Sequence, residues 1–267
     1  MDTGDVNECK RCRHGSLLYN LHDAHIGRSL QLYGEWAEGE MKLLGQLLRP
    51  GDLVLDVGAN IGTHTLFFAR TVGKNGTVLA FEPQRIVFQT LCANVALNSL
   101  LNVHTFHAAV GAKNDSVVVP PIDYETTMNF GGVSLGSHRE GEIVPMLPLD
   151  DLDLPACRLL KIDVEGMELA VLQGAQRLIE TAKPIVYLEN NDPERSGILI
   201  AHLLELGYVL YWHFSPFYNA DNYFANTNNV FGNIVDVNML AVTRQVAGLI
   251  PVTGPDDTAG AALARAR

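Results

Sequence analysis

The feature that most constrains this chain is the segment from Leu53 to Gly62, which reads LVLDVGANIG. A short apolar run is made by Leu53, Val54, Leu55 and Val57, as in strands that are buried on both faces of a parallel sheet. A glycine turn and a helix-compatible apolar run follow directly, so the segment predicts a strand, a turn and a helix. Such a unit directs free backbone N–H groups and a helix N-terminus toward a ligand beyond the strand.

The turn itself supplies candidate ligand contacts. Gly58 and Gly62 carry no Cβ, so a ligand can approach the backbone closely. Asp56 stands at the carboxyl end of the strand, the edge at which open α/β sheets bind their ligands. Asn60 and Thr63 occupy positions that a dinucleotide-binding G-x-G-x-x-G turn fills with glycine, and no Gly-Lys-Ser/Thr follows as in a P-loop. An ordinary βα turn without a ligand is the alternative at this point.

Two further predicted strands end beside this turn. Residues 77–81 are wholly apolar and lead into Glu82. An acid about 20 residues beyond the turn is placed to accept hydrogen bonds from the two hydroxyls of a ribose. Residues 102–106 predict the next strand, and the small residues that follow it, Ala109 among them, leave room for a flat ring. A solvated surface glutamate is the alternative for Glu82, and the apolar strand before it argues against that.

The fourth and fifth predicted strands end in acids. Residues 159–162 are followed by Asp163 and Glu165, and the next strand is followed by Glu189 and Asn190. Because parallel strands end at the same edge of a sheet, we expect these side chains to lie near the glycine turn. Oxygens of Asp163, Glu189 and Asn190 are of the kind that Mg²⁺ prefers, so a divalent metal site is one interpretation of this group.

Strand and helix patterns alternate along most of the chain, which predicts an α/β fold with a doubly wound, Rossmann-like sheet. Helical spacing before residue 50 predicts an N-terminal helical cap, and two short apolar runs between residues 112 and 148 predict an inserted β flap. We therefore divide the chain into a flexible tail, the helical cap, a main domain and a disordered tail, at residues 1–15, 16–50, 51–245 and 246–267.

Composition narrows the classes of partner. Hydrophobic residues make up 47% of the 267 residues, enough for a sizeable core, and the net charge is −11 at pH 7. The negative charge argues against nucleic acid and anionic membranes as non-specific partners. No apolar run reaches the length of a membrane span, and the N-terminus does not resemble a signal peptide. We expect a cytoplasmic protein with a small-molecule ligand, and a homo-oligomer stays open.

The four cysteines do not predict a disulfide framework in a chain of this kind. Cys9 and Cys12 have the spacing of half a zinc site, but no second C-x-x-C follows. His22 and His25 are the available partners, because a structural zinc needs four ligands. An exposed, reduced pair in a mobile terminus is the interpretation we prefer.

Several of these segments together resemble the FkbM family of class I S-adenosylmethionine-dependent methyltransferases. The resemblance is carried by LDVGANIGTHTLFFA from Leu55, AFEPQ from Ala80, HAAVG from His107, LDDL from Leu149, LLKIDVEGMELAVLQGA from Leu159, LEN from Leu188 and NMLAV from Asn238. It implies a seven-stranded methyltransferase sheet with a reversed final strand over residues 51–245. It also implies transfer of a methyl group to oxygen, on a sugar, glycan or other natural product.

Residues of this chain that match the family's cofactor segments are expected to hold S-adenosylmethionine. They are Asp56, Gly58, Asn60, Gly62, Thr63, Glu82, Ala109 and Asp163. The family pattern often has an acid that reads the adenine amino group, and the HAAVG segment lacks one. Backbone groups would have to take that role here.

Methyl transfer from a sulfonium is an in-line displacement, in which the enzyme mainly holds nucleophile, methyl and sulfur in a line. An alcohol is a weak nucleophile, so a general base or a metal is expected. The catalytic candidates are Asp163, Glu165 and His64, and Asp163 is the first choice for the base. Capping of the following helix is the alternative role for Asp163.

Aromatic and acidic residues outside the strand ends are candidate acceptor contacts. Glu35 and Trp36 stand in the predicted cap, and Tyr218 and Tyr223 stand in an asparagine-rich loop. Aromatic rings can stack on a sugar, but they can equally form a packed loop or an oligomer contact.

Two other functions stay open at this level. One is an NAD(P)-dependent oxidoreductase on the same kind of fold, and Asn60 and Thr63 in place of glycines argue against it. The other is a non-catalytic module that binds the cofactor, and the two acids Asp163 and Glu165 argue against that.

Overall fold

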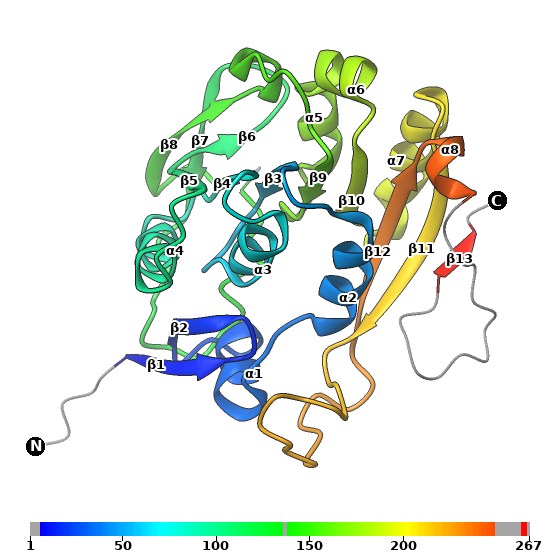
Figure 1. The fold of residues 1–267 in the computed structure, drawn as a ribbon. Helices are drawn as coiled ribbons and strands as arrows, with labels where there is room; N and C mark the ends of the chain where they lie inside the picture. The colour runs from blue at the N-terminus through cyan, green and yellow to red at the C-terminus, as the bar shows by residue number, and fades with distance from the viewer. Residues whose placement is uncertain (1–5, 136–137, 249–262, 266–267) are drawn as a thin grey trace, which may run out of the picture.

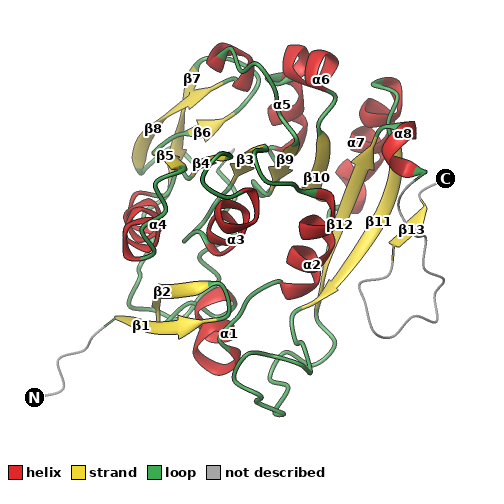
Figure 2. Cartoon of the chain, in the orientation of Figure 1, coloured by secondary structure: helices red, strands yellow, loops and turns green. Residues whose placement is uncertain are grey.

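The computed structural model describes residues 6–135, 138–248 and 263–265. At its centre is an eight-stranded sheet in the order β13-β11-β12-β10-β9-β3-β4-β5 (Figures 1 and 2). The strands are β3 (Leu53–Val57), β4 (Thr77–Phe81), β5 (Val103–Phe106), β9 (Leu159–Ile162), β10 (Ile185–Glu189), β11 (Val209–Pro216), β12 (Val235–Val242) and β13 (Leu263–Arg265).

The strand directions confirm a mostly parallel sheet with a reversed strand. β5, β4, β3, β9 and β10 run parallel to one another, whereas β12 is antiparallel to both β10 and β11. The order differs from the prediction at one edge, because β13 pairs with β11 and adds an eighth strand. The five parallel strands therefore all end at the same edge, where the predicted site residues stand.

Helices cover both faces of the sheet, which is why its central strands are apolar throughout. Val54 and Val78 pack with α2 (Glu38–Leu47) and α3 (Thr63–Val72), and α4 (Arg85–Leu97) lies on the same face. Leu55 and Leu79 face the other side, under α5 (Glu168–Gln173), α6 (Gln176–Ala182) and α7 (Pro193–Glu205). Figure 1 shows these helices on either side of the sheet.

The N-terminal segment differs from the prediction. Where a flexible tail was expected over residues 1–15, β1 (Asn7–Cys12) and β2 (Gly15–Asn20) form an antiparallel hairpin that is followed by α1 (Ile26–Tyr33). The hairpin is ordered because Cys12, Leu17 and Tyr19 are buried in a cluster with α1. The helical cap over 16–50 is therefore correct for α1 and α2 but begins with a strand. Residues 1–5 lie outside the described part.

The predicted flap is confirmed. β6 (Ala109–Val110), β7 (Asp115–Val119) and β8 (Glu142–Leu147) form a small sheet in the order β6-β8-β7. The chain between β7 and β8 returns to the main sheet, where the Gln84 side-chain amide donates to the Phe130 carbonyl oxygen at 2.9 Å. This contact holds the flap loop over the carboxyl end of β4.

The C-terminal prediction of a disordered tail over 246–267 falls largely outside the described residues. Within them, α8 (Arg244–Ala247) follows β12, and β13 pairs with β11. In the described ranges, no helix combines the length and the apolar character that crossing a bilayer requires.

Candidate active site

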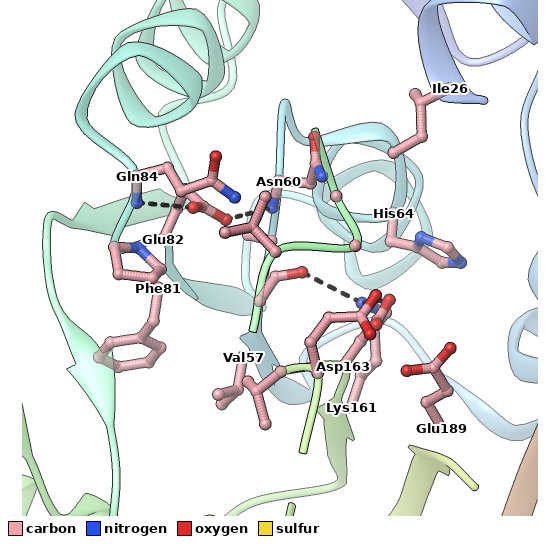
Figure 3. Close-up of a pocket in the computed structure, with 18 of the residues that line it drawn as sticks. Ile26, Val57, Asn60, His64, Phe81, Glu82, Gln84, Lys161, Asp163 and Glu189 are labelled. Carbon is pink, nitrogen blue, oxygen red and sulfur yellow. Dashed lines mark hydrogen bonds and ion pairs between the residues drawn. The ribbon is translucent and has the colours of Figure 1, made fainter. Parts of the chain in front are cut away.

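A pocket of about 380 Å³ lies at the carboxyl ends of the parallel strands, the edge at which such sheets bind ligands. The flap loop and the N-terminal helices complete its walls. The predicted site residues that line the pocket are Trp36, Gly58, Asn60, Thr63, His64, Glu82, Ala109, Asp163, Glu165 and Glu189. Figure 3 shows how the strand ends and the turn after β3 bring several of these side chains together.

The turn after β3 depends on glycine for its backbone conformation and its packing. Gly58 and Gly62 have φ values of +76° and +90°, which side chains rarely adopt. A Cβ at Gly58 would collide with the Asp163 carbonyl oxygen, and one at Gly62 would lie 2.6 Å from Leu91 Cδ1. The glycines are therefore required by packing within the protein, and Gly62 is not among the residues that line the pocket.

Glu82 ties the end of β4 to the glycine turn. Its Oε2 accepts a hydrogen bond from the Asn60 N–H at 2.9 Å, and its Oε1 accepts one from the Gln84 N–H at 2.8 Å (Figure 3). Burial raises the pKa of Glu82 to about 7, although these backbone bonds oppose the shift. Each carboxylate oxygen has two lone pairs, so both can still accept a hydrogen bond from a ligand hydroxyl.

Asp56 lies beneath the turn and does not line the pocket. It is completely buried, accepts a hydrogen bond from Thr65 Oγ1 at 2.6 Å, and lies 3.4 Å from Lys161 Nζ. Because the turn lies between Asp56 and the pocket, Asp56 is placed to support the residues above it.

Lys161 is a buried cation that sequence reasoning missed. Its Nζ donates to the Gly58 carbonyl oxygen at 3.3 Å and lies 3.2 Å from Asp163 Oδ2 (Figure 3). Burial disfavours the charge, but the carboxylates of Asp163 and Asp56 outweigh it and raise the pKa of Lys161. A lysine inside an otherwise apolar strand was the available signal for this ion pair. Such a lysine is buried, and a buried lysine almost always has a charged partner.

Three carboxylates meet at the ends of β9 and β10. Oxygens of Asp163, Glu165 and Glu189 all lie within 4.8 Å of one another, and this is the one group in the described residues whose side chains could share a metal ion. Burial and the charge of Asp163 raise the pKa of Glu165 to about 7, and the same causes raise the pKa of Glu189. Cys9 and Cys12, for which a zinc site was the less favoured alternative, are free thiols of β1, and Cys12 is buried rather than exposed as we expected.

Asn190, which was expected in the metal group, directly follows β10. Its side chain is buried, and its Nδ2 lies 3.9 Å from Met239 Sδ. Its Oδ1 has no hydrogen-bond partner within the described residues, and Asn190 lines a second, smaller pocket together with Glu165 and Glu189. Glu165, which was not expected in the metal group, is the third carboxylate of the cluster.

One side of the pocket has an aromatic wall. Trp36 and Phe217 both line it, and their rings meet edge to face with centroids 4.7 Å apart. His25 lies against the other side of Phe217 at 5.2 Å. Trp36 thus fits the expected acceptor role, and Phe217 joins it from a loop far along the chain.

Three other predicted acceptor contacts hold loops together instead. The Glu35 carboxylate accepts hydrogen bonds from Arg13 Nε at 2.6 Å and from the Asn219 side chain at 2.7 Å. Tyr218 donates to the Asn226 carbonyl oxygen, and Tyr223 lies beneath the Arg13 guanidinium. None of the three predicted residues lines the pocket, because the asparagine-rich loop packs onto the N-terminal segment.

Two further residues that line the pocket, Glu40 and Asn238, were not predicted from the sequence. Glu40 of α2 accepts a hydrogen bond from the Asn238 side-chain amide at 2.9 Å and lies 3.1 Å from His64 Nε2. Glu40, His64 and Asn238 are all buried and line the pocket. The signal for Glu40 was weak, since an acid in the first turn of a helix is usually a surface residue.

Parts of this chain are similar in sequence to known methyltransferases. The family described as the methyltransferase FkbM domain matches residues 56–210. The chain is 42% identical over 91 residues to 31-O-demethyl-FK506 methyltransferase FkbM of Streptomyces tacrolimicus, covering 34% of each chain. It is 27% identical over 177 residues to hexuronic acid methyltransferase AglP of Haloferax volcanii, covering 60% of this chain and 64% of that one.

These matches cover less than two thirds of either relative's length. Among solved structures, methyltransferase FkbM from Methylobacillus flagellatus aligns over 73% of this chain and 45% of its own, with a TM-score of 0.49 and 19% sequence identity.

Proposed function

The chain belongs to the FkbM methyltransferase family, and we propose that it methylates a hydroxyl oxygen of a sugar, glycan or other natural-product-like small molecule. The observation that carries this proposal is the division of the pocket. A glycine turn and an acid at the end of the next strand form one side, and carboxylates with an aromatic wall form the other. A relative named for a hexuronic acid supports a sugar acceptor.

The residues of the first side fit S-adenosylmethionine, which supplies a sulfonium-bound methyl group when it is bound. Backbone N–H groups at the start of α3, beginning at Thr63, suit the cofactor's carboxylate. The free lone pairs of Glu82 suit the ribose hydroxyls. The small side chain of Ala109 leaves room for the flat base, and Gly58 and Asn60 shape the turn between them.

The second side provides residues that orient the acceptor. Asp163 projects beside the turn, and its Oδ2 is already engaged by Lys161 at 3.2 Å. We assign to Asp163 the orientation of the acceptor oxygen, because in-line transfer depends on alignment of the reacting atoms. This refines its expected role as base, since an oxygen that is paired with an ammonium group is less available to take a proton.

Asp163, Glu165 and Glu189 also have the chemistry of a site for a hard divalent cation such as Mg²⁺. Chelation decides between bare carboxylates and a bound cation. If a cation orients the acceptor, treatment with EDTA abolishes methyl transfer and added Mg²⁺ restores it. If the carboxylates act alone, EDTA leaves the rate unchanged.

The function is tested by binding and by turnover. Isothermal titration calorimetry with S-adenosylhomocysteine and with NAD compares the methyltransferase with the oxidoreductase alternative. We expect binding of the first and none of the second. Incubation with S-adenosylmethionine and a panel of sugars and hydroxylated metabolites should then yield S-adenosylhomocysteine and a product one methyl group heavier. Binding without turnover of any acceptor would favour the non-catalytic module.

A further inference from the structure

A buried histidine–glutamate pair borders the acceptor side of the pocket. His64 is the second residue of α3, directly after the glycine turn, and Glu40 lies in α2. Their side chains are 7% and 5% exposed, and His64 Nε2 lies 3.1 Å from Glu40 Oε2. Both residues line the same cavity as the cofactor turn and the aromatic wall, so the pair can reach a ligand although it is buried.

Neighbouring residues fix the orientation of Glu40. Its Oε1 accepts the Asn238 side-chain amide at 2.9 Å, which leaves Oε2 directed at the imidazole. The Tyr187 hydroxyl, which lies 2.7 Å from His213 Nδ1, also favours the ionised form of the Glu40 carboxylate. A carboxylate held on both oxygens cannot rotate freely, so it can hold one histidine tautomer.

The other ring nitrogen of His64 is free. Within the described residues, Nδ1 makes no hydrogen bond, and Nε2 is the atom that contacts Glu40. A carboxylate on one ring nitrogen holds the proton there and leaves the opposite nitrogen with an available lone pair. The available nitrogen belongs to a side chain that lines the pocket.

We propose that His64 accepts the proton of the acceptor hydroxyl at Nδ1 and that Glu40 is the positioning residue that keeps Nδ1 unprotonated and stabilises the imidazolium. The inference rests on the proposed methyl transfer to oxygen. An oxygen lone pair of the acceptor forms the new bond to the methyl carbon as the carbon–sulfur bond breaks and leaves its electron pair on sulfur. The hydroxyl proton moves to His64 Nδ1 and then to solvent.

A second histidine–glutamate pair in the same region provides a contrast. His14 Nε2 lies 2.7 Å from Glu38 Oε2, and Glu38 is two residues before Glu40 in α2. Arg13 Nε also lies 3.8 Å from the Glu38 carboxylate. Neither His14 nor Glu38 lines the pocket. The two pairs share their chemistry and their helix but not access to a ligand, so Glu38 offers a matched control.

The charges around the pair set its pH dependence. The groups that act on its charge are Lys161 of β9, Asp163 directly after β9, Asp56 of β3, Tyr187 of β10, Asp236 of β12 and His14 of the hairpin. Burial raises the pKa of Glu40 to about 8, with Lys161 opposing, and burial with the charge of Lys161 lowers the pKa of His64 to about 4. The competent form has Glu40 ionised and His64 neutral. The rate should therefore rise as the pH increases through the Glu40 pKa.

The tautomer test needs no acceptor. Nitrogen-15 NMR of the histidine-labelled protein, with His64 assigned by comparison with His64→Asn, reports which ring nitrogen carries the proton at pH 9. We expect Nε2 to be protonated and Nδ1 to be bare. Protonation at Nδ1 under these conditions would overturn the proposal, even if the protein proves to methylate no member of the acceptor panel.

The kinetic test uses the first acceptor that the panel identifies. We expect Glu40→Gln to bind S-adenosylhomocysteine normally and to keep its KM, but to lose on the order of a hundredfold in kcat and the alkaline rise in rate. Glu40→Asp, which keeps a carboxylate, should recover part of the rate and the rise. Glu38→Gln should match the unmodified protein throughout. A normal pH profile for Glu40→Gln, or an equal loss in Glu38→Gln, would refute the role of Glu40.

Discussion

The two sides of the pocket are built in different ways. The side that we assign to the cofactor is formed largely by one continuous stretch, the turn after β3, and by Glu82 at the end of the next strand. The side that we assign to the acceptor combines side chains from α2, α3, β10, β12 and the loop that contains Phe217. Backbone shape in a short stretch serves a ligand common to a whole family, whereas side chains gathered from distant segments can change with the acceptor.

The largest loss of methyl transfer is expected from a change at Asp163, which lies where the two sides of the pocket meet. Asp163→Asn keeps the size of the side chain and removes its charge. Methyl transfer should fall by roughly a hundredfold or more, because alignment at the reacting centre is lost. Cofactor binding should change little. Steady-state kinetics and calorimetry with S-adenosylhomocysteine separate the two, and a variant with full activity would leave Asp163 only a structural role.

Loss of Glu82 should act on the cofactor side alone. Glu82→Ala removes the acceptors for the ribose hydroxyls and for the Asn60 and Gln84 N–H groups. Groups left unpaired cost roughly 1–3 kcal/mol, so calorimetry should show S-adenosylhomocysteine bound about 5- to 150-fold more weakly. Glu82→Gln, which keeps one acceptor oxygen, should lose less. Unchanged affinity in Glu82→Ala would remove Glu82 from the cofactor site.

The aromatic wall should act on the acceptor side alone. Trp36→Ala removes one of the two rings that meet at 4.7 Å, so a stacked acceptor loses contact area. The KM for the acceptor should rise about tenfold, while the affinity for S-adenosylhomocysteine stays unchanged. Tyr223→Ala is a matched control, since Tyr223 does not line the pocket. An equal rise in KM for both variants would contradict the division of the pocket.

The smallest expected effect is the pH dependence of cofactor binding. Burial raises the pKa of Glu82 to about 7, and an ionised carboxylate accepts stronger hydrogen bonds than a protonated one. The affinity for S-adenosylhomocysteine should therefore increase as the pH rises through 7, by several-fold. Calorimetry between pH 6 and pH 8 measures this change, and Glu82→Gln should abolish it. A dependence of opposite sign would show that the protonated acid binds the ribose.

The contrast between one continuous stretch and side chains from distant segments also explains which features could be predicted from the sequence. The bounds of β3, β4 and β9 follow from apolar runs that end at a turn, and these runs are local signals. The hairpin of β1 and β2 was missed because NECKRC is polar, and its order comes from burial against α1. The local sequence pattern was therefore sufficient for strands that are apolar themselves, but not for strands whose order depends on packing against another element.

The errors on the acceptor side have the same origin. Glu165 was left out of the metal group because adjacency in sequence does not show which side chains converge in the fold. Glu35 is held by Arg13, a contact across the fold that no local pattern contains. Lys161 could be noticed as a charge among apolar residues, whereas Glu40 gives only a weak signal in sequence, and the partners of both become known only from the packing of the sheet and helices.

The central claim is transfer of a methyl group to oxygen in this pocket. The direct measurement supplies the purified protein with S-adenosylmethionine labelled with carbon-13 at the methyl group, together with the hydroxylated acceptor panel. Products are examined by mass spectrometry and carbon-13 NMR. The account predicts a product one methyl group heavier whose label has the chemical shift of a methoxy group, and predicts that Asp163→Asn greatly reduces it. A label attached to nitrogen or carbon would contradict the account, as would full labelling by Asp163→Asn.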